Sequence, residues 1–206
     1  NESNKRGYSF QNGGYYLPVS KYLDLTFLGD YYTNGSYGIN ISSQYKKRYR
    51  YNGNFSIRYE NLIDGERGLP EYSKSTIYNV RWTHTKDSKS SPYSSLSASV
   101  NFGSSDYFRQ SVNQLNTPNF LNNNLSSSVS YSKTFPGDAG VRLSLTTSMS
   151  QNTQSKEVNL TLPTLTLNTA RFYPFAKKGG TKKGIIQNIN LQYSSRGENR
   201  TTLADS

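Results

Sequence analysis

The sequence predicts an all-β fold: a transmembrane antiparallel β-barrel, of which this chain supplies only the first roughly nine or ten strands. Three observations support this. Short segments alternate apolar and polar residues, their polar positions hold small or amide side chains, and 14% of the 206 residues are aromatic although only 33% are hydrophobic. Successive side chains of a strand point to opposite faces, so each segment has one apolar and one polar face. The apolar face either packs inside a soluble sandwich or contacts lipid.

The composition favours lipid contact over a soluble core. Soluble globular domains use about 45–50% apolar residues, and the mean hydropathy here is −0.79. Values this low also occur in disordered chains, but those are poor in aromatic residues, whereas this chain has 18 tyrosines. A barrel with a wet lumen needs no apolar core. The chain has no cysteine, which excludes disulfides and thiolate metal sites.

The strands are expected in chain order, separated by turn signals. A meander of three strands opens the pattern, with Asn34-Gly35 and Asn52-Gly53 as its tight turns, because both residue types tolerate positive φ. Residues 103–124 form a long Asn-rich loop, and residues 177–183 form a basic loop. Strands are expected at residues 22–31, 37–49, 55–59, 76–84, 96–102, 125–135, 141–149 and 157–169, with a final strand marked by Ile189, Leu191 and Tyr193.

The strand at residues 157–169 changes phase along its length. Its apolar positions shift from Leu160 and Leu162 to Leu165 and Leu167, and Pro163 lies at the shift. A proline cannot donate to the hydrogen-bond ladder and is tolerated at irregular positions of a sheet. We therefore predict a bulge or kink at Pro163.

The domain organisation is expected to be simple. Residues 1–12 form a leading segment, and residues 13–206 form the N-terminal portion of an outer-membrane β-barrel domain that is incomplete in this chain. No stretch approaches the roughly 18 apolar residues of a spanning helix. The first residues lack the apolar stretch of a secretory signal, so an exported protein would be represented here by a mature form or an internal fragment.

Catalytic and cofactor chemistry finds little support. His84 is the single histidine, which leaves no multi-histidine metal site. No spacing selects a serine partner for it, and the carboxylates are scattered. No glycine-rich phosphate loop opens a helix. We expect no enzyme activity, no cofactor and no metal.

Basic residues are the main candidates for ligand contact, since the formal net charge is +11. Guanidinium and ammonium groups on polar faces could bind the phosphates of a lipid. An equally good interpretation is that they hydrate the lumen or pair with acidic loops. Nucleic-acid binding ranks lower, because most tyrosines do not share the face of the basic residues. The candidate lumen-facing contacts are Lys46, Arg48, Arg50, Arg58 and Arg81.

Several segments, in their order along the chain, resemble the LptD family of outer-membrane lipopolysaccharide-assembly proteins. The match begins where the barrel of that family begins and spans residues 13–175. No single motif decides it; the order of the strands and turns does. The segments are GGYYLPVSKYLDL (residues 13–25), GDYYTNGSYG (29–38), YKKRY (45–49), SASVNFGSS (97–105) and VNLTLP (158–163).

The resemblance implies a function, a location and partners. Members of the family join a periplasmic jellyroll to a barrel of about 26 strands, filled by an LptE-like plug lipoprotein, and release lipopolysaccharide through a lateral gate into the outer leaflet. Bridge proteins would deliver the lipid to the jellyroll, and insertion machinery would assemble the barrel among outer-membrane lipid of a Gram-negative bacterium. The gate strand would include Tyr15, Tyr16 and Pro18. No jellyroll precedes residue 13, and the cysteines of well-known members are missing.

Two other functions stay open at this point. A porin-like or nutrient-transporter barrel would use the basic lumen to select anions and would close with about 16–18 strands. A soluble all-β adhesin or nucleic-acid binder would instead pack its apolar faces together and need no detergent.

Overall fold

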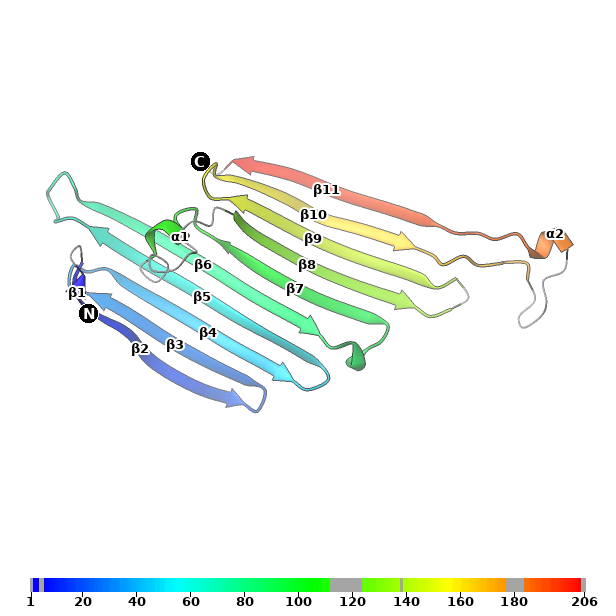
Figure 1. Ribbon diagram of the computed structural model, residues 1–206, viewed down its shortest axis with the longest axis horizontal. Coiled ribbons are helices and arrows are strands. Elements are labelled where there is room, and N and C mark those ends of the chain that lie inside the picture. Colours follow the sequence, from blue (N-terminus) through cyan, green and yellow to red (C-terminus); the bar gives the residue numbers. More distant parts are fainter. Residues whose placement is uncertain (1, 4–5, 112–123, 138, 177–183, 205–206) are drawn as a thin grey trace.

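The described part of the chain folds into a long antiparallel sheet with three short helical segments (Figure 1). The structure is a computed structural model that describes residues 2–3, 6–111, 124–137, 139–176 and 184–204. The helical segments are η1 (Ser88–Ser90), α1 (Tyr107–Gln110) and α2 (Gly184–Gln187). The strands are β1 (Glu2–Ser3), β2 (Gly7–Ser20), β3 (Leu23–Tyr32), β4 (Tyr37–Lys47), β5 (Tyr51–Asp64), β6 (Ser73–Lys86), β7 (Ser94–Gly103), β8 (Asn124–Phe135), β9 (Val141–Asn152), β10 (Glu157–Asn168) and β11 (Ser194–Ala204).

The sheet is a pure meander. Its 11 strands lie in the order β1 to β11, so each strand pairs with its neighbours in the sequence. This confirms the all-β class and the meander of the first strands. Among the described residues the sheet does not close: β11 has one unpaired edge, and β2 pairs on its outer side only with the two residues of β1.

The register keeps polar and apolar residues on separate faces. Directly paired residues of antiparallel strands share a face. One row across five strands reads Thr26, Ser42, Ser56, Arg81 and Asn101, and the adjacent row reads Phe27, Ile41, Ile57, Val80 and Phe102. No register shift interrupts the pairing from β3 to β7. We call these the polar face and the apolar face.

Of the two predicted Asn-Gly turns, one is present in the structure and the other is not. The turn at Asn34-Gly35 is confirmed, with the Gly35 N–H donating to the Tyr32 carbonyl at 2.9 Å. The turn at Asn52-Gly53 is wrong: both residues lie inside β5, paired with Lys46 and Tyr45. The turn occupies residues 48–50, and Tyr49 adopts a positive φ of 60° there.

Gly53 has a packing role instead of a turn role. A Cβ at this position would lie 2.3 Å from the Tyr45 hydroxyl oxygen and 2.4 Å from the ring carbon that carries it. The tyrosine ring therefore covers the glycine, and any larger residue would displace the ring. An Asn-Gly pair is a strong hairpin signal, but here cross-strand packing accounts for the glycine.

The last predicted strand is also wrong in position. Ile189, Leu191 and Tyr193 precede β11. Leu191 forms an isolated bridge with Phe172, and the Tyr193 carbonyl accepts the Thr169 N–H at 2.8 Å. β11 itself alternates charged and small residues, so no apolar period marks it. The basic loop at residues 177–183 and most of the predicted loop at 103–124 lie outside the described residues.

β10 shifts register at the predicted place. The pairing of β10 with both β9 and β11 shifts between Thr161 and Thr164, so that Leu162 and Pro163 lie between the two registers. Thr161 and Thr164 consequently both lie on the polar face. The irregularity restores the apolar alternation on the far side of the proline, as Leu165 and Leu167 pair with Leu145 and Leu143.

Candidate functional site

Burial is inverted relative to a soluble protein. On the apolar face, Ile39 is 46% exposed and Leu165 is 45% exposed. On the polar face, Asp30, Arg58 and Glu60 are buried. Soluble domains place apolar side chains inside and expose charge. A sheet with a bare apolar face and a partly covered polar face is organised as a membrane barrel wall, with lipid on one side and water on the other.

The buried charges form one cluster on the polar face. The Arg58 guanidinium donates through Nη2 to Asp30 Oδ2 at 2.6 Å and through Nε to Glu60 Oε1. Asp30 also accepts the backbone N–H of Asn12 at 2.8 Å, which ties β2 to the cluster. One cation thus joins carboxylates of β3 and β5. Burying a charge is costly unless it is paired and hydrogen-bonded.

Gly38 lies directly beside this arrangement. It lies on β4 between Asp30 and Glu60, its register partners on either side. A Cβ there would lie 3.4 Å from Asp30 Oδ2 and 3.5 Å from Arg58 Nη2. Such distances are ordinary van der Waals contacts, so Arg58 reaches Asp30 across β4 directly over this residue.

The segment after β7 covers the cluster. Ser111 is fully buried and donates through Oγ to Glu60 Oε1 at 2.9 Å. Tyr107 of α1 packs with Leu62, Ile77 and Leu125 in the buried apolar cluster of the described chain. Burial raises the pKa of the Tyr107 phenol above its ordinary value, partly offset by the charge of Arg58. The cover thus supplies apolar contact and one hydrogen bond to a carboxylate.

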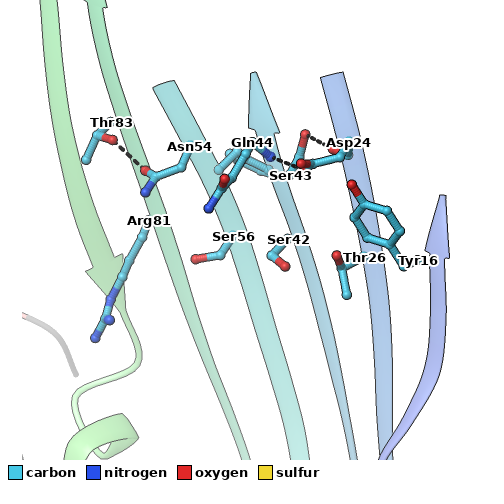
Figure 2. A pocket seen from close by; sticks show the side chains of 11 residues that line it. Tyr16, Asp24, Thr26, Ser42, Ser43, Gln44, Asn54, Ser56, Arg81 and Thr83 are labelled. Carbon is cyan, nitrogen blue, oxygen red and sulfur yellow. Dashed lines mark hydrogen bonds between the residues drawn. The ribbon is translucent and has the colours of Figure 1, made fainter. Parts of the chain in front are cut away.

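A second region of the polar face is a groove of about 470 Å³ between β2 and β6 (Figure 2). Tyr16 of β2 and Arg81 of β6 lie at its two sides in Figure 2. Between them lie amide and hydroxyl groups, among them Gln44, Asn54 and Ser56. Asp24 Oδ1 accepts the Gln44 backbone N–H at 2.8 Å. An aromatic ring with amides, hydroxyls, one carboxylate and one guanidinium suits a polyhydroxylated ligand.

The leading strand β2 is the least regular of the long strands. Its pairing with β3 shifts twice, between Phe10 and Gly13 and between Pro18 and Ser20. Asn12, within the first shift, has a φ of 57°. By contrast, the pairings of β4 with β3 and with β5 show no shift.

The predicted gate residues lie on different faces of β2. Tyr15 pairs with Phe27 on the apolar face and is 78% exposed, whereas Tyr16 pairs with Thr26 on the polar face. Pro18 is the register partner of Asp24 and lines a smaller pocket with Tyr16. Only Tyr16 of the three therefore reaches the groove of Figure 2.

The five predicted basic contacts do not gather in one place. Arg58 is held in the buried cluster, and Arg81 lines the groove. Lys46 lies near the end of β4 on the polar face, where its register partner is Asn52. Arg48 and Arg50 lie in the turn after β4, because that strand ends at Lys47 and not at residue 49. Lys46, Arg48 and Arg50 therefore do not share one strand face.

Sequence reasoning missed the carboxylates that matter most. Asp30 and Glu60 seemed unpaired because 30 positions separate them, yet the meander brings both next to Gly38. Counting the register outward from a two-residue turn at Asn34-Gly35 would have aligned Asp30 with Ile39, one residue away from its observed partner Gly38. Ser111 and Tyr107 carried no signal, since they lie in an unpatterned segment.

The described residues offer neither a metal-binding group nor a membrane-spanning helix. No group of three or more His, Asp or Glu side chains in this part of the chain could hold a metal ion. Neither α-helix of the described chain has the length and apolarity needed to cross a membrane. His84 stacks on Tyr45 and Tyr51 and contacts the Tyr45 hydroxyl through Nδ1 at 3.0 Å, within an aromatic cluster.

Comparison with known proteins identifies the family. A family model described as LptD protein matches residues 1–206, the whole chain. The chain therefore belongs to the LptD protein family, which serves lipopolysaccharide transport and assembly at the outer membrane of Gram-negative bacteria. No curated protein matches the chain.

Proposed function

We propose that this LptD-family chain forms a wall of the barrel through which lipopolysaccharide enters the outer leaflet, and that β2 borders the lateral opening. The separation of faces carries the proposal: an unbroken register from β3 to β7 leaves one face apolar and one polar. We infer that the protein acts in transport and not in catalysis, as the family's role implies.

The polar face suits the saccharide part of the transported lipid. Lipopolysaccharide has a large hydrophilic sugar portion that must avoid the hydrocarbon, and acyl chains that must reach it. The groove offers amides and hydroxyls to the sugars, and one of its sides is Tyr16 of the leading strand. A molecule in the groove thus lies beside the edge of the sheet, where its acyl chains would have the shortest route to lipid.

The irregular pairing of β2 supports a seam at this edge. Every regular residue pair adds to the cohesion of a β-ladder, and each bulge disrupts it locally. Two shifts within one strand, together with Pro18, leave β2 the least regularly paired of the long strands. We infer that opening would occur beside β2, the strand that carries this irregular pairing.

The open edges of the sheet and the family's role suggest the partners of this chain. Unpaired strand edges are not tolerated in hydrocarbon, so we infer that further strands of the barrel pair with β2 and β11. An LptE-like plug would occupy the lumen on the polar face, and periplasmic bridge proteins would deliver the lipid through a jellyroll domain. Insertion machinery would hold the edges during assembly.

Site-specific photocrosslinking tests the path. The photoreactive residue p-benzoylphenylalanine replaces Tyr16 in the full-length protein in cells. We expect lipopolysaccharide adducts there. The same residue at Tyr131, on the apolar face of β8, is the control for bulk lipid contact. Equal labelling at both positions, or none at Tyr16, would contradict the proposed path. Depletion of the protein should reduce surface lipopolysaccharide.

A further inference from the structure

The two ends of the sheet differ in charge. At the end that holds α1, carboxylates pair with arginines: Arg58 with Asp30 and Glu60, Arg6 with Asp64, and Arg109 with Asp106. The opposite end, with the turns after β2, β4 and β6, is rich in cations. We call it the basic end. Its cations are Lys21, Lys46, Lys47, Arg48, Arg50, Lys86 and Lys89.

The carboxylates nearest to these cations are already engaged with backbone. Asp24 accepts the Gln44 N–H, and Asp87 Oδ1 accepts the Lys89 N–H at 2.8 Å. None of the ion pairs found among the described residues includes a cation of the basic end. The positive charge of this end is therefore not neutralised within the described chain.

A cavity of about 480 Å³ lies between the turns after β4 and β6. Lys46, Lys47, Arg48 and Lys86 line it, together with Asp87 as its one carboxylate. The backbone holds the two turns together, since the Asp87 N–H donates to the Arg50 carbonyl at 2.8 Å. Four basic residues thus line one space between two fixed turns, and the Lys86 ammonium group also donates to Ser94 Oγ at 2.6 Å. Such a lining suits a ligand that carries more than one negative charge.

Tyrosine rings hold several of the cations in place. Lys47 Nζ lies 5.1 Å from the centre of the Tyr22 ring, and Arg48 lies 4.7 Å from the Tyr49 ring. Lys89 Nζ approaches the same Tyr49 ring at 5.3 Å. These cation–π contacts stabilise the cations without neutralising them. Tyrosine and basic side chains together are also typical of the membrane–water interface, where lipid headgroups lie.

We propose that this cavity binds a phosphate monoester of a lipid headgroup, and that the lipid is lipopolysaccharide. The choice of lipid rests on the proposed function; the phosphate site does not. A phosphate monoester approaches two negative charges near neutral pH, whereas the phosphodiester of phosphatidylglycerol carries one. Four basic lining residues against one carboxylate favour the more highly charged group.

Binding of the full-length protein in detergent tests the site. The probes are lipopolysaccharide, the same lipopolysaccharide after phosphatase removal of its monoester phosphates, and phosphatidylglycerol. The variant K46Q/R48Q/K86Q removes three cations of the cavity. The control variant R67Q/K74Q/K156Q removes three cations from the other end. We expect the first variant to bind lipopolysaccharide about tenfold or more weakly than the wild type. The control variant should bind it as tightly as the wild type. The wild type should bind the phosphatase-treated lipid as weakly as the first variant binds untreated lipopolysaccharide.

Other results overturn the proposal. Equal weakening in both variants would mean a general charge effect, and undiminished binding of phosphatase-treated lipid would exclude the monoester. Equally tight phosphatidylglycerol binding would refute the choice of lipid. Heat-modifiable gel mobility shows whether the triple variant folds. If it does not, the single variant Arg48→Gln, in an exposed turn, replaces it. Undiminished lipopolysaccharide binding by Arg48→Gln refutes the site. If phosphate-dependent binding is found but depletion leaves surface lipopolysaccharide unchanged, the proposed transport fails while the site stands.

Discussion

The polar face is built in two ways. Between β3 and β6 it holds Asp30, Arg58 and Glu60, buried beneath the segment that contains α1. Across β7, β8 and β9 it holds hydroxyl residues that stay partly or fully exposed, such as Ser97 bonded to Ser130 at 2.7 Å. The same face of the same sheet therefore carries a buried ion cluster in one half and a hydroxyl surface in the other.

The difference shows what a covering segment demands of a polar face. Where water reaches the sheet, small hydroxyls are satisfied by solvent and by each other, and no strong interaction is needed. Where a segment excludes water, each buried polar group needs a partner within the protein. The charged cluster supplies such partners and fixes the cover through Ser111. The four substitutions below test this contrast, from the largest expected effect to the smallest.

Arg58→Met should be the most damaging. It leaves the carboxylates of Asp30 and Glu60 buried without their cation, which costs about 3–5 kcal/mol. Urea unfolding of the full-length protein in detergent, followed by heat-modifiable gel mobility, measures the loss. Arg142→Met, on the exposed polar face of β9, is the matched control. Similar losses for both variants would show that the cluster is not special.

A charge on the apolar face should cost almost as much. Leu145 and Thr146 are neighbours on β9, but Leu145 pairs with Tyr131 and Thr146 with Ser130. Leu145→Arg places a cation in hydrocarbon, at a cost of about 2–4 kcal/mol near the bilayer centre. Thr146→Arg places it in the lumen and should be tolerated. Unfolding in lipid vesicles separates the two. The reverse order would mean that the faces are assigned the wrong way round.

Ser111→Ala should loosen the cover without unfolding the sheet. It removes the hydrogen bond to the Glu60 carboxylate, and such bonds to charged groups contribute about 1.5–3 kcal/mol. Hydrogen exchange at the amides of α1 should accelerate while that of β4 and β5 stays unchanged. Ser128→Ala, on the open polar face, controls for loss of a hydroxyl. Unchanged exchange in α1 would show that apolar packing around Tyr107 suffices.

Ser130→Ala should have the smallest effect. Water can replace the Ser97–Ser130 hydrogen bond at this exposed position, so we expect a change within about 0.5 kcal/mol. The same urea measurement applies. A loss as large as that of Ser111→Ala would indicate that the hydroxyl half of the face is covered in the assembled protein.

Much of the sheet was predictable because strand alternation is a local property. The strands from residue 22 to residue 169 were found from their apolar period and turns. β2 was missed as a complete strand, and it begins at Gly7, inside the segment expected to precede the barrel. Its two register shifts and its run of glycines break the alternation that sequence reasoning relies on.

The candidate site was less predictable, because it depends on pairing across strands. Arg58 looked like a free lumenal cation until the register placed it beside two carboxylates. Arg48 and Arg50 looked like strand residues because the Asn-Gly signal put the turn several residues too late. The strand register determines which of several cations lies beside a carboxylate. A shift of one residue would move each side chain to the opposite face of the sheet.

The meander has a consequence for how such a wall can grow. In the described chain, strands that contact each other extensively are neighbours in the sequence. Apart from these strand pairs, α1 contacts β6. Beyond the region of α1, a hairpin could be duplicated or deleted without repacking a distant element. The barrel circumference could thus change in steps of two strands during evolution. The segment with α1 is where such a change would meet resistance, since it ties β6 and β5 to a partner outside the ladder.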